Sequence, residues 1–115
     1  MAVLEKGEIF AVFTISTSKN PPSCLAGSYG TPTGLHAIAD KIGAGAPVGT
    51  VFKGRVSTGQ VYGQVSPEDA ERNLITSRIL RLSGLEIGKN CGEGRDSYDR
   101  YIYIHGSNHE DRIGQ

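Results

Sequence analysis

Glycine and proline divide this chain into segments too short for long helices. The 115 residues include 16 glycines and 5 prolines, which recur between most of the apolar stretches. Both residues are typical of turns, and both are disfavoured inside helices and strands. The pattern therefore favours short strands joined by turns, as in a small β-rich domain.

Five segments have the composition or the apolar–polar alternation that predicts a β-strand. They are Glu8–Ser16, Leu35–Ala39, Thr50–Val56, Thr76–Ser83 and Arg100–His105. The alternation in the first segment predicts a strand with at least one buried face. Two longer segments, Thr17–Gly34 and Gly84–Asp99, are rich in glycine and polar residues, so we expect surface loops there.

Helical signals are limited to one place. Ser66 is a candidate N-cap, because Pro67 and the acids Glu68 and Asp69 follow it. The signal fades by Asn73, so we expect one short helical turn. The sequence thus predicts a single domain over residues 1–115 that is mainly β, with at most one short helix. We expect a small β-sandwich or a curled mixed sheet.

Charge and hydropathy exclude two classes of partner. The 12 lysines and arginines balance the 12 aspartates and glutamates, so no strong positive field would gather nucleic acid. No apolar run approaches the roughly 18 residues that a membrane span requires. Met1–Lys6 lacks the features of a secretory signal peptide. We therefore expect no nucleic acid and no membrane span.

Cys24 and Cys91 lie far apart in the sequence, in surroundings rich in glycine and serine. Their spacing fits no zinc or redox motif. Two interpretations remain open. The residues are two free thiols, or they form a disulfide between two loops, which requires a proximity that sequence does not reveal.

The last predicted strand separates two kinds of side chain. Ile102 and Ile104 share one face, which we assign to the core, while Tyr101, Tyr103 and His105 share the other. A polar loop follows from Gly106 to Asp111. The tyrosine face either forms the wall of a cleft or simply covers the sheet.

Two other kinds of site are weaker hypotheses. A metal site would combine residues with suitable ligand atoms, namely His36, His105, His109, Glu110 and Asp111, but His105 and His109 fall at a strand–loop junction and not on one helical face. A phosphate cradle at Gly43–Gly49 is disfavoured, because Pro47 interrupts it and no Lys-Ser/Thr follows. We expect no metal and no cofactor.

Three segments, in this order, carry a family resemblance. They are Gly27–Arg55 (GSYGTPTGLHAIADKIGAGAPVGTVFKGR), Thr76–Glu86 (TSRILRLSGLE) and Asp96–Gln115 (DSYDRYIYIHGSNHEDRIGQ). Together they cover more than half of the chain, and they resemble the catalytic domain of YkuD-type L,D-transpeptidases. The stretch YIYIHG with its polar loop is similar to the approach to that family's active-site motif.

The resemblance implies a mainly β enzyme that cross-links bacterial peptidoglycan through a cysteine acyl-enzyme. The donor is a tetrapeptide stem, cut after its third residue, a diamino acid, with release of the terminal D-Ala. The acceptor is the side-chain amine of the diamino acid in another stem. Some relatives instead attach a lipoprotein to the wall. The implied partners are stem peptides, and the implied location is the periplasm or cell wall.

Residue roles follow from the same resemblance. By motif position, His105 is the base that takes the proton of the thiol, and the carbonyl of Gly106 orients its ring. Tyr103 would line the stem-peptide cleft on the same strand face. Ser107 and Asn108 either donate hydrogen bonds to the substrate or are simply solvated.

The sequence departs from the family at its C-terminal end. The family motif continues after a spacer with Ser or Thr followed by His-Gly-Cys, whereas this chain ends ten residues after His105. Cys24 and Cys91 lie far from the motif position, so we expect the domain to be incomplete and inactive as given. We also expect an open sheet edge that lowers stability or pairs with a second copy. The alternative is a non-catalytic cell-wall-binding or structural β-domain.

Overall fold

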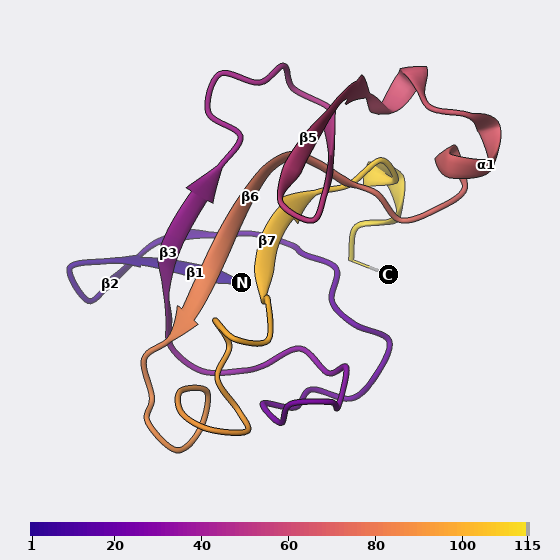
Figure 1. Cartoon of the computed structure of the whole chain (residues 1–115). Helices are drawn as coiled ribbons and strands as arrows, with labels where there is room; N and C mark the ends of the chain where they lie inside the picture. The colour runs from indigo at the N-terminus through magenta and orange to yellow at the C-terminus, as the bar shows by residue number, and fades with distance from the viewer. Residues whose placement is uncertain (115) are drawn as a thin grey trace.

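The computed structural model describes residues 1–114, which form two antiparallel β-sheets (Figure 1). The smaller sheet contains β1 (Ala2–Glu5) and β2 (Glu8–Val12). The larger one contains β3 (His36–Ile42), β4 (Thr50–Lys53), β5 (Val56–Val61), β6 (Ile75–Gly84) and β7 (Tyr103–Gly106). The prediction of a mainly β fold is confirmed.

Helical structure is short and begins where the sequence predicts. The α-helix α1 (Pro67–Ala70) is capped by Ser66, whose Oγ accepts a hydrogen bond from the backbone N–H of Asp69 at 3.2 Å. Two 3-10 turns, η1 (Tyr62–Gln64) and η2 (Glu110–Arg112), complete the helical elements of residues 1–114. None of these helices is long and apolar enough to cross a membrane.

The larger sheet is organised around β6. One edge of β6 pairs with β7, through Thr76 and Ile79–Arg81. The other edge pairs first with β4, at Ile75 and Thr76, and then with β3, from Ile79 to Gly84. Between these two parts Ser77 has a φ of 68° and the register with β7 shifts. Such an irregularity bends a strand, so β6 links the β4–β5 hairpin to the β3–β7 part of the sheet.

Two of the predicted single strands are wrong in their extent, because the chain reverses within or beside them. The segment Thr50–Val56 turns back at Gly54 and Arg55, whose φ values of 55° and 69° suit a two-residue type I′ turn. The segment Glu8–Ser16 stops at Val12 and pairs with β1 across Lys6 and Gly7, which also have positive φ. Positive φ at Lys6 and Arg55 is uncommon, and apolar–polar alternation does not signal it.

The N-terminal hairpin lacks the buried face that its alternation predicts. Ile9 is 68% exposed, and Phe10 and Val12 are each 71% exposed. Alternation records which side chains share a face but not whether another layer covers that face. The prediction of a buried face is therefore wrong for β2.

The last strand is also shorter than predicted. β7 begins at Tyr103, whereas the preceding residues form a turn in which Tyr101 has a φ of 58°. The turn is fixed by backbone hydrogen bonds from Tyr101 N to Tyr98 O (3.1 Å) and from Ile102 N to Ser97 O (3.2 Å). These local bonds replace the strand pairing that the alternation predicts for Arg100 and Tyr101, while the carbonyl oxygen of Ile102 still accepts from Leu82 N of β6 at 2.9 Å.

The buried hydrophobic core is small. Among the described residues it contains Val51, Phe52, Leu74 and Ile79, which surround the junction of β4 and β6. Ile102 and Ile104, which we assigned to the core, are only half-buried. They line a wide, open hollow of about 2430 Å³ that extends to Phe13 and Ile15 of the N-terminal segment. The apolar face of the larger sheet therefore remains open to solvent.

Candidate active site

The close approach of β7 to β6 determines which residue can occupy position 106. Gly106 pairs with Thr76, and His105 pairs with Ile79. A Cβ atom at position 106 would lie 2.8 Å from both the carbonyl oxygen and Oγ1 of Thr76, closer than side chains approach in proteins. Glycine is required here because β6 leaves no room for a side chain.

His105 is exposed at the border of the hollow, and a local hydrogen bond orients its ring. Its Nδ1 lies 2.7 Å from the carbonyl oxygen of Gly106. A carbonyl can only accept, so Nδ1 carries the hydrogen and the neutral ring holds its lone pair on Nε2. Nε2 makes no hydrogen bond within residues 1–114. An oriented ring with an open acceptor nitrogen suits a general base.

Tyr103 belongs to a group of side chains that we call the Tyr/Arg cluster, composed of Arg55, Arg81, Tyr98, Tyr101 and Tyr103. Arg55 Nη1 donates a hydrogen bond to the Tyr103 hydroxyl at 3.0 Å and lies over the ring of Tyr101, with its Cζ 4.8 Å from the ring centroid. The guanidinium of Arg81 lies 3.6 Å from the Tyr98 ring centroid and 4.6 Å from that of Tyr101. Alternating cations and aromatic rings hold one another in place.

Hydrogen bonds fix the far side of the same cluster. Arg81 donates from Nε and Nη2 to the carbonyl oxygen of Tyr98, and the Tyr98 hydroxyl donates to Asp40 at 2.7 Å. The bond to Asp40 raises the pKa of Tyr98 above its ordinary value. The hydrogen bond to the Tyr103 hydroxyl raises the pKa of Arg55 above its ordinary value. The cluster thus presents an aromatic and cationic surface close to His105.

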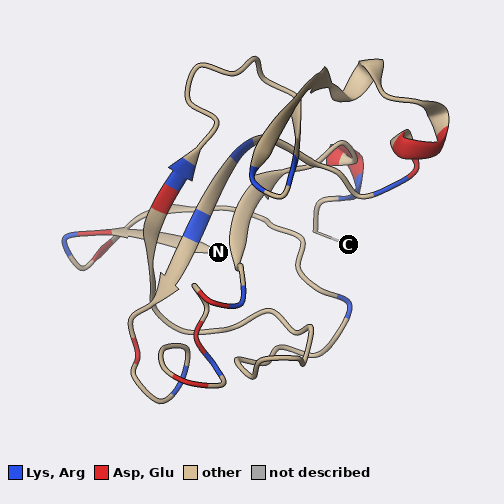
Figure 2. Cartoon of the chain, in the orientation of Figure 1, with Lys and Arg blue, Asp and Glu red and all other residues tan. Residues whose placement is uncertain are grey.

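Sequence reasoning found the tyrosines at positions 101 and 103 but missed Arg55, Arg81 and Tyr98. Arg81 is the cross-strand partner of Tyr103, and Arg55 occupies the turn between β4 and β5. The basic residues of the sheet lie on β3, β4 and β6 and at this turn, while β7 carries neither lysine, arginine, aspartate nor glutamate (Figure 2). Strand register and the position of the turn bring these residues together, and a single sequence does not reveal either.

Asn108 and Ser107 follow β7, but their polar groups serve the protein itself. The Asn108 side chain donates to the carbonyl oxygens of Ala70 (3.1 Å) and Arg72 (3.0 Å) and accepts from Leu74 N (3.0 Å). It therefore ties the α1 region to the end of β7. Ser107 Oγ accepts from His109 N at 2.9 Å, and its hydroxyl hydrogen can still be donated.

The residues considered for a metal site do not assemble into one. No group of three or more His, Cys, Asp or Glu side chains within residues 1–114 is placed to hold a metal ion. His109 Nε2 lies 3.1 Å from the carbonyl oxygen of Arg72, and His36 belongs to a separate network. The geometry gives no support to the metal hypothesis.

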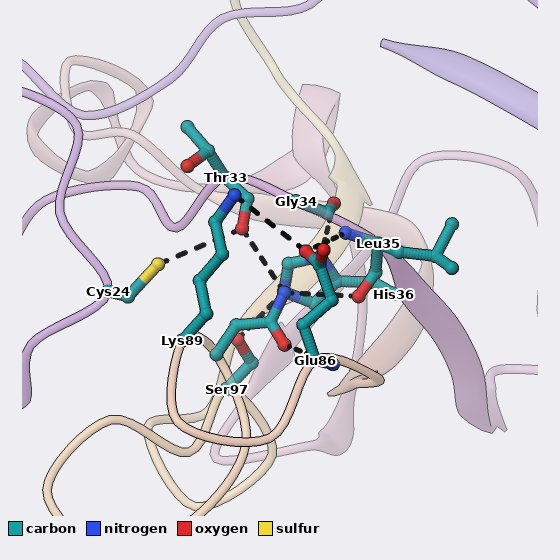
Figure 3. Close-up of polar contacts among 9 residues, drawn as sticks. Cys24, Thr33, Gly34, Leu35, His36, Glu86, Lys89 and Ser97 are labelled. Carbon is teal, nitrogen blue, oxygen red and sulfur yellow. Dashed lines mark hydrogen bonds and ion pairs between the residues drawn. The ribbon is translucent and has the colours of Figure 1, made fainter.

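A buried polar junction, which we call the Asn90 junction, was not predicted (Figure 3). Asn90 has no exposed surface, and its Nδ2 donates to the carbonyl oxygens of Thr33 (3.2 Å) and Leu35 (3.0 Å). Its Oδ1 accepts from Glu86 N at 2.9 Å, and Glu86 Oε2 accepts from Leu35 N at 3.0 Å. Asn90 therefore joins the end of the first long loop to the loop that follows β6.

The same junction contains a serine–histidine pair with the spacing of a nucleophile and its base. Ser97 Oγ lies 2.8 Å from His36 Nε2, and His36 Nδ1 lies 3.0 Å from the carbonyl oxygen of Gly34. Ser97, however, has no exposed surface, so no substrate carbonyl can reach its Oγ. We therefore interpret this pair as a structural anchor at the start of β3.

Comparison with known proteins gives no match: no family model, no curated protein and no solved structure is similar to this chain.

Proposed function

We propose that this chain carries the base-bearing part of the active site of a bacterial peptidoglycan L,D-transpeptidase, located in the periplasm or at the cell wall. The observation that carries this proposal is the hydrogen bond between His105 Nδ1 and the Gly106 carbonyl oxygen at 2.7 Å. This bond leaves the lone pair of Nε2 open at the border of the hollow.

The arrangement of the three resembling segments also supports the proposal. Gly27–Arg55 supplies β3 and β4, Thr76–Glu86 supplies most of β6, and the last segment supplies β7. These strands are direct neighbours, since β6 pairs with β3, β4 and β7. Segments that are distant in the sequence therefore form one continuous sheet with His105 at its edge.

The proposed chemistry assigns His105 two proton transfers. Nε2 takes the proton from a cysteine thiol, and the thiolate attacks the carbonyl carbon of the third residue of the donor stem. Collapse of the tetrahedral intermediate breaks the bond to the terminal D-Ala, whose nitrogen receives the proton from the imidazolium. The acceptor amine, or that of a lipoprotein, then attacks the thioester and releases the thiol. Gly106 holds the ring in position throughout.

Tyr103 and the rest of the Tyr/Arg cluster are the proposed binding surface for the stem peptide. The charged guanidinium of Arg55 attracts a carboxylate, and the ring of Tyr101, which is 54% exposed, offers an apolar contact. Ser107 retains a hydroxyl hydrogen for the substrate. We leave Asn108 out of this surface, because its donors and its acceptor are occupied within the protein.

The two cysteines of the chain do not supply the thiol. Cys24 Sγ lies 3.7 Å from the carbonyl oxygen of Thr33, and Cys91 lies in the loop after β6. Neither forms a hydrogen bond to His105. We therefore predict that the 115 residues alone do not release D-Ala from a tetrapeptide stem.

The first test is to translate the encoding DNA beyond the codon for Gln115. The proposal expects Ser or Thr followed by His-Gly-Cys shortly downstream. The product of the whole reading frame should then release D-Ala from tetrapeptide muropeptides and form cross-links detectable by mass spectrometry. An immediate stop codon would instead favour a non-catalytic protein.

Substitution of the base gives the second test. In the whole product, His105→Gln should lower the rate of D-Ala release by about 10²–10⁴-fold, because the thiol loses its proton acceptor. Its melting temperature should stay within a few degrees of the parent, since His105 is exposed. His109→Gln, three residues beyond the end of β7, is the matched control and should retain activity. Equal activity of the two variants would refute the role of His105.

A non-catalytic wall-binding domain is the second candidate, and the exposed side chains of Arg55 and Tyr101 in the Tyr/Arg cluster favour it. In this case the cluster holds sugar or peptide without reaction. The 115-residue chain should then sediment with peptidoglycan sacculi without a covalent adduct, and Tyr101→Ala should weaken this binding. Covalent capture of stem peptide by the whole product would exclude this candidate.

A further inference from the structure

We propose that Cys24 and Cys91 are a site of disulfide formation, which joins the loop of residues 17–34 to the loop of residues 85–99. Both cysteines are half-buried, and both thiols are free in this structure. The inference is independent of the proposed function, because it depends only on the packing of the two loops.

The two loops converge on one carbonyl oxygen. Cys24 Sγ lies 3.7 Å from the oxygen of Thr33 (Figure 3). Asn90 Nδ2, from the residue immediately before Cys91, lies 3.2 Å from the same oxygen. One side chain from each loop thus approaches Thr33. The first is Cys24 itself, and the second is Asn90, which immediately precedes Cys91.

Contacts on either side of the cysteines hold the loops together. Ala26 N donates to the carbonyl oxygen of Gly94 at 2.8 Å. Arg100, at the end of the second loop, donates to the carbonyl oxygens of Ser23 (3.2 Å) and Gly30 (2.8 Å). Cys24 lies between Ser23 and Ala26, and Cys91 lies before Gly94. The two loops that carry the thiols are therefore in contact, although the Cys91 thiol is hydrogen-bonded to Asp96 of its own loop and must turn away from it to reach Cys24.

A disulfide requires Cα atoms about 4.4–6.8 Å apart and Cβ atoms that face each other. The loops contain residues that can adjust to this geometry. Gly27, Gly92 and Gly94 have positive φ values of 78°, 107° and 78°, and no atom lies within 4 Å of a Cβ placed at any of them. Glycines in open space allow small backbone shifts at low cost.

The chemistry needs a disulfide as oxidant, such as glutathione disulfide or an oxidised thiol–disulfide oxidoreductase. The thiolate of one cysteine attacks the oxidant and forms a mixed disulfide, and one thiol of the oxidant leaves. The second thiolate then attacks the protein sulfur of the mixed disulfide, and the second thiol leaves. The two cysteines lose two electrons and two protons, which the two departing thiols carry away.

The bond would stabilise the loops that hold the start of β3 and the turn before β7. It would close a large ring of the chain, and such rings restrict the unfolded state strongly. The oxidised chain should therefore melt on the order of 10 °C higher than the reduced chain. Tyr98 lies near the end of the second loop and Tyr101 directly follows it, so the surface that they form should become more rigid.

The test uses the unaltered 115-residue chain, equilibrated with reduced and oxidised glutathione. After alkylation of the remaining thiols, mass spectrometry of the digested chain should show one peptide pair linked through Cys24 and Cys91. The bond should form at least about tenfold faster in the native chain than in the chain unfolded by urea, because the fold holds the two loops in contact. Thermal unfolding with and without a reductant then measures how much the disulfide raises the melting temperature.

A relocated cysteine serves as the matched control. In Cys91→Ser combined with Ser57→Cys, the second thiol lies on β5, which is exposed and distant in the sheet from the first long loop. This variant should remain reduced or form only intermolecular links. The proposal is overturned if both native thiols remain fully alkylated, if the native chain oxidises no faster than the unfolded chain, or if oxidation fails to raise the melting temperature.

Discussion

Asn90 and Ser97 are polar and have no exposed surface, whereas Ile102 and Ile104 are apolar and only half-buried. The first pair lies in the Asn90 junction between two loops, and the second pair lines the hollow of the larger sheet. The polar side chains of a loop junction are thus more deeply buried than the apolar side chains on one face of the sheet.

The difference shows that burial of polar side chains and burial of an apolar sheet face have different requirements. Buried polar groups are tolerated where each one has a hydrogen-bond partner, and no buried side-chain nitrogen or oxygen atom in the described residues lacks one. A local set of loops can meet this condition alone. Burial of an apolar sheet face instead requires a second layer of structure. The pairing with a second copy that the sequence predicts would extend the sheet at its edge, whereas a copy packed on the face would supply this layer. Sedimentation of the purified chain at several concentrations tests whether either association occurs.

Removal of Asn90 should produce the largest loss of stability. Asn90→Ala removes three hydrogen bonds and leaves the N–H of Glu86 without its partner, while the carbonyl oxygens of Thr33 and Leu35 keep Cys24 Sγ and Leu85 N as donors. Each of the three lost hydrogen bonds contributes about 1 kcal/mol, and the unsatisfied N–H of Glu86 adds to this, so we expect a loss of about 3–4 kcal/mol in the free energy of unfolding. Urea unfolding followed by circular dichroism measures this change.

Asn73→Ala is the matched control for this experiment, because Asn73 is exposed and forms no hydrogen bond through its side chain within residues 1–114. Its effect should remain within about 0.5 kcal/mol. Similar losses from the two substitutions would show that the Asn90 junction does not stabilise the fold.

Two neighbouring residues of β6 test how far the apolar face of the larger sheet is open to solvent. Ile79 has no exposed surface and belongs to the core, whereas Leu80 is half-buried and faces the hollow. Ile79→Ala should cost about 3 kcal/mol through lost burial and a cavity. Leu80→Ala should cost about 1 kcal/mol, because its methyl groups are already partly in contact with water.

The difference of about 2 kcal/mol between these variants should appear in urea unfolding of the same preparation. An equal or larger loss for Leu80→Ala would mean that another layer covers the hollow in solution. The most direct candidate for that layer is a second copy of the chain, and the loss would then depend on protein concentration.

The sequence predicted the parts of the fold that local chemistry determines. Apolar–polar alternation located β3, β6 and β7 to within a few residues, and Ser66 with Pro67 located α1. The reversals at Lys6 and Arg55 were missed, because neither residue type favours positive φ.

The candidate site was predicted less completely than the fold. The alternation placed Tyr103 and His105 on one face, but the contribution of Arg55 and Arg81 depends on strand register and on a hairpin turn. Asn90 was missed because it lies in a polar loop, where exposure is the usual expectation. Its burial results from contacts with Thr33 and Leu35, which are distant in the sequence.

The smallest expected effect concerns the loop beside the Asn90 junction and depends on pH. The carboxylate of Asp96 accepts hydrogen bonds from Gly92 N (3.0 Å) and Asp99 N (3.2 Å), which hold its pKa below the ordinary value. Because the folded pKa is lower than the unfolded pKa of about 3.9, the stabilisation is complete above that value. It disappears as the pH falls through the folded pKa.

Asp96→Ala should therefore cost about 1 kcal/mol near neutral pH, as the loss of a capping carboxylate usually does. Asp96→Asn keeps an acceptor oxygen but has no proton to bind, so its stability should depend less on acid than that of the parent. Thermal unfolding from about pH 7 to about pH 3 measures both effects, with Glu93→Gln as a control in the same loop. If the parent and Asp96→Asn lose stability in parallel across this range, the charge of Asp96 does not stabilise the loop, and the strength of this region rests on Asn90 and its neutral hydrogen bonds alone.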